Sequence, residues 1–208
     1  LWGISDAALA PTGSGDNMVE AYNYRICLTS DKENMLPIEK PANYDASRYE
    51  LLLRIIEAQK LYALNNYFII SPMPNNKTDI NNRGAFSTDM IGMNHSYPEA
   101  SYEERAEIIQ AHKDYTLGLL WFMGNDERMP KQLRDQMLAL GLPKDEYLEY
   151  GHWTPQLYIR EARRLVGEYV ATQANCDNVA KVDDGVGMAA YTMDSHNCQR
   201  VVIVKEGK

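Results

Sequence analysis

Residues 67–82 read YFIISPMPNNKTDINN, so a short apolar run is followed within a few residues by a polar cluster. The apolar part, residues 67–70, is aromatic and β-branched and predicts a short strand. The cluster concentrates an ammonium group, a carboxylate and several amides, and a strand that ends in such a cluster delivers polar groups to one place. The alternative is a simple turn, because Asn and Asp bond readily to their own backbone. The candidate ligand-facing residues are Lys77, Asp79, Asn81 and Asn82.

Length, composition and net charge limit the class of protein. The chain has 208 residues, 45% of them hydrophobic, which suits one domain with a sizeable core. Its net charge of −8 argues against a nucleic-acid partner, which normally meets a basic surface. No apolar run approaches the roughly 20 residues that span a bilayer. Three separated cysteines and four histidines without i, i+4 spacing give no support for a metal site.

Periodicity and capping signals outline an α+β fold. The stretch 19–29 predicts a strand with Tyr22, Tyr24, Ile26 and Leu28 on one face. The predicted helices are 46–64 after the cap Asp45, 102–123 after the capping box of Ser101 and Glu104, 131–140 after Pro130, and 155–172 after Thr154. Residues 1–17 are expected to be a connector, and residues 187–193 with 200–205 are expected to form a terminal hairpin. About four helices would then pack on a small, mainly antiparallel sheet.

Basic residues concentrate in the predicted helix 155–172. On a helix, Arg160, Arg163, Arg164 and Gly167 would share one face, because neighbours are three and four residues apart. Arginine forks match carboxylate and phosphate geometry, so Arg160 and Arg164 are candidates for orienting an anionic group. The alternative is a solvated face with an ion pair between Glu161 and Arg164, which would contribute little at a surface.

A carboxylate and an imidazole stand close together at Asp194-Ser195-His196, near the tip of the predicted hairpin. Histidine moves protons near neutral pH, which makes His196 and Asp194 candidate catalytic residues. An ordinary turn is the alternative, since adjacent side chains on an extended chain point apart. No G-x-S-x-G elbow supports a serine nucleophile here.

Several segments together carry a family resemblance. They are YNYRICLT at 22–29, KPANYD at 40–45, NKTDINN at 76–82, DMIG at 89–92 with Tyr97-Pro98, LYIREARR at 157–164 and YTMDSH at 191–196. In this order they resemble the bacterial FAD-dependent oxidoreductase family, whose members sometimes carry a xanthan lyase label. The resemblance covers most of residues 18–205.

The resemblance implies a longer parent protein that uses FAD and opens with a Rossmann-type segment bearing G-x-G-x-x-G. Gly13 and Gly15 lack the third glycine of that turn. Residues 1–208 are therefore expected to be a single excised, substrate-side domain that holds no FAD by itself. Its partners would be the flavin-binding domain of the same parent and a small-molecule or carbohydrate substrate.

The resemblance also suggests roles for the candidate residues. Lys77, Asp79, Asn81 and Asn82 would approach the flavin or the substrate. Arg160 and Arg164 would orient an anionic group or fix neighbouring loops, and Asp194 with His196 would transfer protons beside hydride transfer.

Two other classes of function stay open. A polysaccharide lyase of xanthan type needs a Tyr or His base and a group that neutralises a uronate, and the chain contains such residues. A carbohydrate-binding module or a purely structural domain is also compatible with the composition. The compartment is open between periplasmic or secreted and cytoplasmic, in a bacterium.

Overall fold

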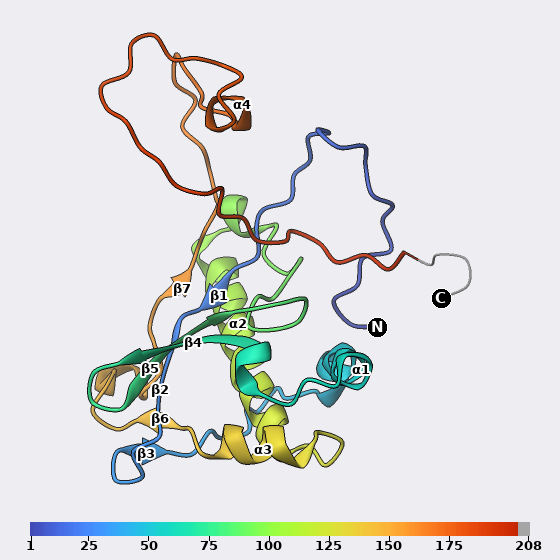
Figure 1. The fold of residues 1–208 in the computed structure, drawn as a ribbon, viewed down its shortest axis with the longest axis vertical. Coiled ribbons are helices and arrows are strands. Elements are labelled where there is room, and N and C mark those ends of the chain that lie inside the picture. The colour runs from blue at the N-terminus through green and yellow to red at the C-terminus, as the bar shows by residue number, and fades with distance from the viewer. Residues whose placement is uncertain (204–208) are drawn as a thin grey trace.

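The computed structural model describes residues 1–203. Short antiparallel strands form one side of the body, and a long helix crosses behind them with two shorter helices beside it (Figure 1). The helices are α1 (Glu50–Gln59), α2 (Tyr102–Asn125), α3 (Lys131–Leu138) and α4 (Gln173–Cys176). Helices on one side of antiparallel strands define an α+β fold, so the predicted fold class is confirmed.

The polar stretch 77–82 is the central strand of the largest sheet rather than a loop. That sheet has the order β2 (Ile26–Thr29), β5 (Lys77–Asn82), β4 (Phe68–Met73). β4 and β5 form a hairpin whose turn contains Asn75 and Asn76, both with positive φ (61° and 54°), a conformation that asparagine tolerates well. The turn alternative therefore holds only for the residues between the two strands.

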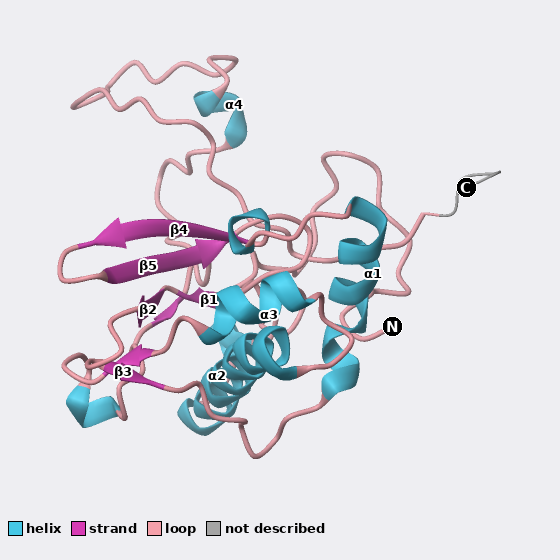
Figure 2. Ribbon diagram, turned by 60° about the horizontal axis from the view of Figure 1, so that its bottom comes forward, coloured by secondary structure: helices cyan, strands magenta, loops and turns pink. Residues whose placement is uncertain are grey.

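Two further pairs of strands complete the antiparallel structure. β1 (Asn23–Tyr24) pairs with β7 (Leu157–Tyr158), and β3 (Met35–Leu36) pairs with β6 (Leu142–Pro143). The predicted strand 19–29 is thus divided into β1 and β2, with Arg25 between them. Figure 2 shows the strands gathered on one side and the helices on the other.

Alternation along β1 and β2 fixes which side of the strands faces the core. Tyr22, Tyr24, Ile26 and Leu28 are each at most 2% exposed, as their spacing predicted. The residues between them, Asn23, Arg25 and Cys27, therefore point to the opposite face. The core face packs on α2, where Tyr115, Leu119 and Phe122 are almost fully buried.

The capping signals at Ser101 and Asp45 located the starts of helical segments. Ser101 Oγ accepts from Glu104 N at 3.2 Å, and Ser101 N donates to Glu104 Oε2 at 2.7 Å, so the predicted capping box is present at α2. Asp45 caps as predicted, but it caps a 3₁₀ turn, Ala46–Tyr49, that leads into α1. α1 ends near Lys60, which has a positive φ of 56°, so the helix is shorter than the predicted 46–64.

The predicted helix 155–172 is wrong. Residues 157 and 158 instead form β7, and residues 159–172 have no regular secondary structure. Long-range contacts outweigh the local signal: Leu157 is buried against the core, and Glu161 accepts a hydrogen bond from Glu20 N at 2.9 Å. The apolar face proposed for this helix also lacks a core, since Leu165 and Val166 are about nine-tenths exposed.

The predicted terminal hairpin is also wrong. No strand occurs in residues 187–203, and the last two residues of the second predicted strand, 204 and 205, lie outside the described residues. Residues 162–193, here called the arm, leave the body and return to it, carrying α4 (Figure 1). Among residues 1–203, no helix combines the length and apolarity needed to cross a bilayer.

Candidate functional site

One face of the β2–β5 pair carries a row of polar side chains. Asn23, Arg25 and Cys27 point away from the core, and Lys77, Asp79 and Asn81 alternate along the neighbouring strand β5. Cys27 lies directly opposite Asp79 in the register. The strand therefore brings three of the predicted candidates, Lys77, Asp79 and Asn81, onto one face.

Lys77 closes one end of this row. Its Nζ lies 2.8 Å from Asp145 Oδ2 and 2.5 Å from Glu146 Oε1. Both hydrogen bonds raise the pKa of Lys77, and the one to Asp145 has the larger effect. The amine therefore stays charged. Both carboxylates belong to the segment after β6, so Lys77 ties this segment to the hairpin turn.

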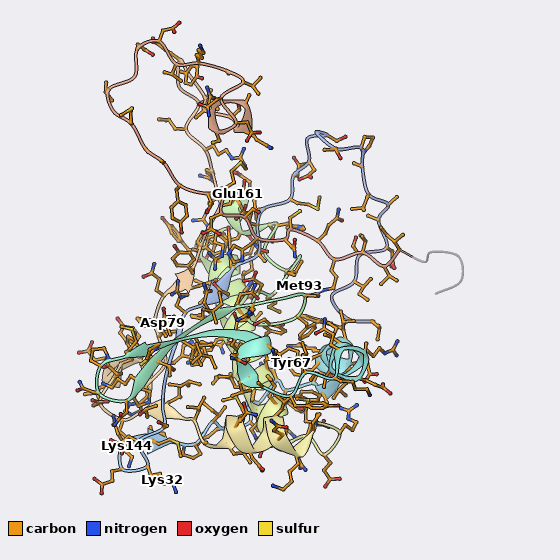
Figure 3. The ribbon with its side chains drawn as sticks, viewed as in Figure 1. Lys32, Tyr67, Asp79, Met93, Lys144 and Glu161 are labelled. Atoms are coloured by element: carbon orange, nitrogen blue, oxygen red, sulfur yellow. The ribbon has the colours of Figure 1, made fainter. Side chains whose placement is uncertain are left out.

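Asp79 forms the middle of the row. Its Oδ1 accepts from Arg25 Nε at 3.0 Å, and its Oδ2 meets a second guanidinium nitrogen, so the pair is bidentate. Figure 3 shows Asp79 on its strand, away from the helices. Arg25 is 42% exposed, so the ion pair itself contributes modestly to stability.

The other end of the row is a buried polar cluster centred on Asn23, which is 0% exposed. Asn23 Nδ2 donates to Asn81 Oδ1 at 3.0 Å and to Thr88 Oγ1 at 3.1 Å. Its Oδ1 accepts from an Arg160 terminal nitrogen at 2.8 Å. Asn23 thus joins β5, the 83–90 loop and the segment after β7 through one side chain.

An aspartate–histidine pair, Asp89 and His196, extends this cluster. His196 Nδ1 lies 2.6 Å from Oδ2 of Asp89, whose side chain is 3% exposed. Asn82 Oδ1 accepts from the Asp89 backbone N at 3.1 Å and so positions the carboxylate. Burial raises the pKa of Asp89, and the hydrogen bond from His196 partly offsets that rise.

Two polar atoms of the cluster have no hydrogen-bond partner within the described residues. They are Asp89 Oδ1 and Arg160 Nε, and both are buried. Burial lowers the pKa of Arg160, while the nearby charge of Asp89 opposes that shift. Because buried polar atoms are normally satisfied, these two atoms mark a place for a bound polar group or water.

The two remaining candidates lie outside the cluster. Arg164 lies at the start of the arm, where its side chain is 77% exposed and forms an ion pair with Glu161. This ion pair at the surface is the alternative to an anion-binding role. Figure 3 shows Glu161 where the arm leaves the body. Asp194 Oδ1 lies 3.9 Å from His196 Nε2 and is 68% exposed, so it faces the outer side of the imidazole.

Sequence reasoning missed Asn23, Thr88 and Asp89. Asn23 stands in a strand whose alternate residues are all buried, and its position opposite that core face was the available signal. Asp89 gave no local signal, because its partner His196 is 107 residues away. Within residues 1–203, no three His, Cys, Asp or Glu side chains gather in a way that would hold a metal ion.

A sequence model of the family described as FAD dependent oxidoreductase matches residues 5–208, nearly the whole chain. The chain belongs to this family. The comparison with curated proteins found no match, and neither did the comparison with solved structures.

The described residues of this family member do not fit the dinucleotide part of FAD. Such a group is usually held where a parallel strand leads through a glycine-rich turn into a helix. Every strand pair within residues 1–203 is antiparallel. The residues that precede the four α-helices are Tyr49, Ser101, Pro130 and Thr172, none of them glycine. The described residues therefore lack a phosphate cradle of this type.

Proposed function

We propose that this chain is the substrate-side part of an FAD-dependent oxidoreductase and that its buried polar cluster handles a proton of the bound substrate. The observation that supports this proposal most directly is the Asp89–His196 pair, whose Oδ2–Nδ1 distance is 2.6 Å. Family membership supplies the class of reaction, and the cluster supplies groups suited to proton transfer.

The pair has the geometry of an oriented imidazole. A carboxylate accepts hydrogen bonds, so the ring nitrogen facing Asp89 carries the proton and donates it. Nε2 is then left as an acceptor on the side of the ring that faces Asp194. In this tautomer His196 would act as the general base, with Asp89 as its positioning residue.

Arg160 would complete the site with a fixed positive charge. One of its terminal nitrogens is committed to Asn23, while its buried Nε has no partner in the described residues. A substrate oxygen that develops negative charge would be stabilised by such a preorganised donor. Asn81 and Asn82 would act indirectly, because their amides hold Asn23 and the backbone of Asp89.

The adenine dinucleotide would be held by a separate flavin-binding domain, because the described residues lack a cradle for it. Lys77 and Asp79 form ion pairs that shape the sheet face, so we assign them a structural part in the site. Arg164 is exposed at the start of the arm, where it would meet an anionic group outside this chain.

The test is a substrate screen on the flavin-loaded parent protein, followed by substitutions. Alcohols, amines and saccharides are assayed for oxidation with a dye as electron acceptor. With any substrate found, we expect His196→Gln to lower kcat at least a hundredfold and Asp89→Asn about tenfold, since general acid–base catalysis contributes roughly 10²–10⁴-fold. His152→Gln, which alters a histidine bound only to a backbone carbonyl, is the matched control and should leave kcat unchanged.

Unchanged kcat in both His196→Gln and Asp89→Asn would remove the proposed role of the pair. A polysaccharide lyase is the competing function, and it predicts a different product. Cleavage of an acidic polysaccharide with a new ultraviolet-absorbing double bond, without any flavin, would favour the lyase.

A further inference from the structure

A groove of about 550 Å³ lies over the polar face of β2 and β5, outside the buried cluster. Its floor comes from the strands and from the 74–76 turn, and its wall comes from the segment 146–158. The volume falls within the range of roughly 300–1,000 Å³ that small-ligand sites occupy. Neither the family description nor the proposed proton-transfer role assigns a ligand to it.

The charges around the groove are already paired with one another. Arg25 is held by Asp79, and Lys77 is held by Asp145 and Glu146. The lining itself holds two cations, Arg25 and Lys77, and two carboxylates, Asp79 and Glu146, so its formal charges balance. An anionic or a cationic ligand would therefore have to displace an existing ion pair. The electrostatics favour a neutral ligand.

The groups left for a ligand are amphiprotic, meaning that each can both donate and accept. Five such side chains line the groove without a hydrogen bond to another described residue, namely Asn75, Tyr147, Thr154, Gln156 and Tyr158. Thr154 is only 8% exposed, so its unpartnered hydroxyl is a built-in feature of the wall rather than a loose surface group. Ligand hydroxyls are amphiprotic too and match this set.

Two aromatic rings give the groove apolar surfaces beside these polar groups. Tyr147 is 36% exposed and Tyr158 is 42% exposed, so each ring presents part of its surface. The Arg160 guanidinium stacks on Tyr158, with its central carbon 4.6 Å from the ring centroid. Rings combined with hydroxyls and amides suit a molecule that has both C–H faces and many hydroxyls.

We propose that this groove binds a neutral saccharide, with Tyr147 and Tyr158 against its C–H faces and Thr154, Gln156 and Asn75 bonded to its hydroxyls. Through Tyr158 and Arg160, the bound sugar would lie next to the Asp89–His196 cluster. Saccharide binding does not depend on the proposed redox role, because it requires no flavin and is measured without turnover.

The test is calorimetric titration of the protein with cellotriose, maltotriose and mannotriose, each at millimolar concentration. Trigalacturonate and spermidine serve as the anionic and cationic probes. We expect at least one neutral trisaccharide to bind and both charged probes to bind at least tenfold more weakly. Absence of binding by all three neutral sugars to folded protein, or preference for a charged probe, would overturn the proposal.

Substitutions then locate the site. Tyr158→Ala and Tyr147→Ala should each weaken the binding of the neutral sugar about tenfold, as loss of an aromatic anchor does elsewhere. Thr154→Val, which keeps the shape and removes the hydroxyl, should weaken binding severalfold. Tyr102→Ala alters an 84% exposed tyrosine away from the groove and should change nothing. Unchanged affinity in all three groove variants, with circular dichroism showing them folded, would overturn the proposal.

Discussion

Nδ1 of His196 lies 2.6 Å from Oδ2 of Asp89, although the two residues are 107 positions apart in the chain. His196 follows the arm, and Arg160 precedes it and reaches the same cluster through Asn23. Both ends of the arm are therefore fastened at one buried polar site. The arm itself exposes apolar side chains such as Val186 and Met188, so its position depends on these anchors rather than on packing along its length.

The first prediction concerns the tautomer of His196. Asp89 accepts from Nδ1, so the neutral ring should carry its proton on Nδ1, and nitrogen-detected NMR of the imidazoles should show that pattern. Asp89→Leu removes the acceptor without changing the size of the side chain greatly, and the ring should then shift toward protonation on Nε2. A wild-type ring protonated on Nε2 at neutral pH would contradict the assigned geometry.

The second prediction is a pH dependence that arises from His112. Burial lowers the pKa of this histidine from 6.5 to about 4, and its Nδ1 donates to the Ile108 carbonyl at 2.7 Å. The unfolded chain binds the proton more readily, so the stability from this group is complete above pH 6.5 and is lost as the pH falls toward 4. Between pH 7 and pH 5, the free energy of unfolding should fall by about 2 kcal/mol from this group.

His112→Leu isolates that effect. The variant fills a similar volume and removes the titrating group, so its stability should depend less on pH over the same interval. Urea unfolding of both proteins at pH 7 and pH 5 provides the comparison. Parallel losses of stability in the two proteins would show that His112 is not the source.

The third prediction concerns the centre of the cluster. Asn23→Ala removes three side-chain hydrogen bonds at a fully buried position and leaves Arg160 and Asn81 without this partner. The free energy of unfolding should fall by about 3 kcal/mol. Asn125→Ala, at an exposed position with one bond to a backbone carbonyl, should cost less than about 1 kcal/mol in the same urea titration. Equal costs for the two variants would argue against the cluster as a structural anchor.

The fourth prediction compares two glycines of α2. A Cβ added at Gly118 would overlap the hydroxyl of Tyr49, which is held by a hydrogen bond to the Tyr115 carbonyl at 2.8 Å. A Cβ added at Gly124 would meet only side-chain atoms, with Leu138 Cδ2 at 3.2 Å and Met137 Cγ at 3.6 Å. Gly118→Ala should therefore destabilise the protein by about 2 kcal/mol, whereas Gly124→Ala should be neutral or slightly stabilising because alanine favours helix. Thermal unfolding of both variants distinguishes them.

Sequence signals predicted the structure correctly where residues close in the chain determine it. The capping box of Ser101 and Glu104 located α2, and the alternation of Tyr22, Tyr24, Ile26 and Leu28 identified the core face of the first strands. Both depend on neighbours within a few residues. They required no knowledge of what packs against them.

Local signals failed where distant partners decide the conformation. The apolar spacing in residues 155–172 is helical, yet Leu157 pairs with β1 and Arg160 is drawn to Asn23, 137 residues away. The polar residues of 77–82 locally predict a cluster or a turn, whereas the strand that they form depends on lying between β2 and β4. For the same reason the sequence pointed to Asn81, Asn82, Arg160 and His196 separately and did not reveal Asp89, which helps bring them together.

The most direct test is the flavin content of residues 1–208 and of the longer parent protein that we propose contains them, measured by visible absorption after addition of FAD and gel filtration. We expect the parent to show a flavin spectrum that bleaches with a reductant and the isolated chain to retain no FAD. A colourless, folded parent that takes up no FAD would contradict the proposed oxidoreductase role. Retention of FAD by residues 1–208 alone would contradict the proposal that a separate domain holds it.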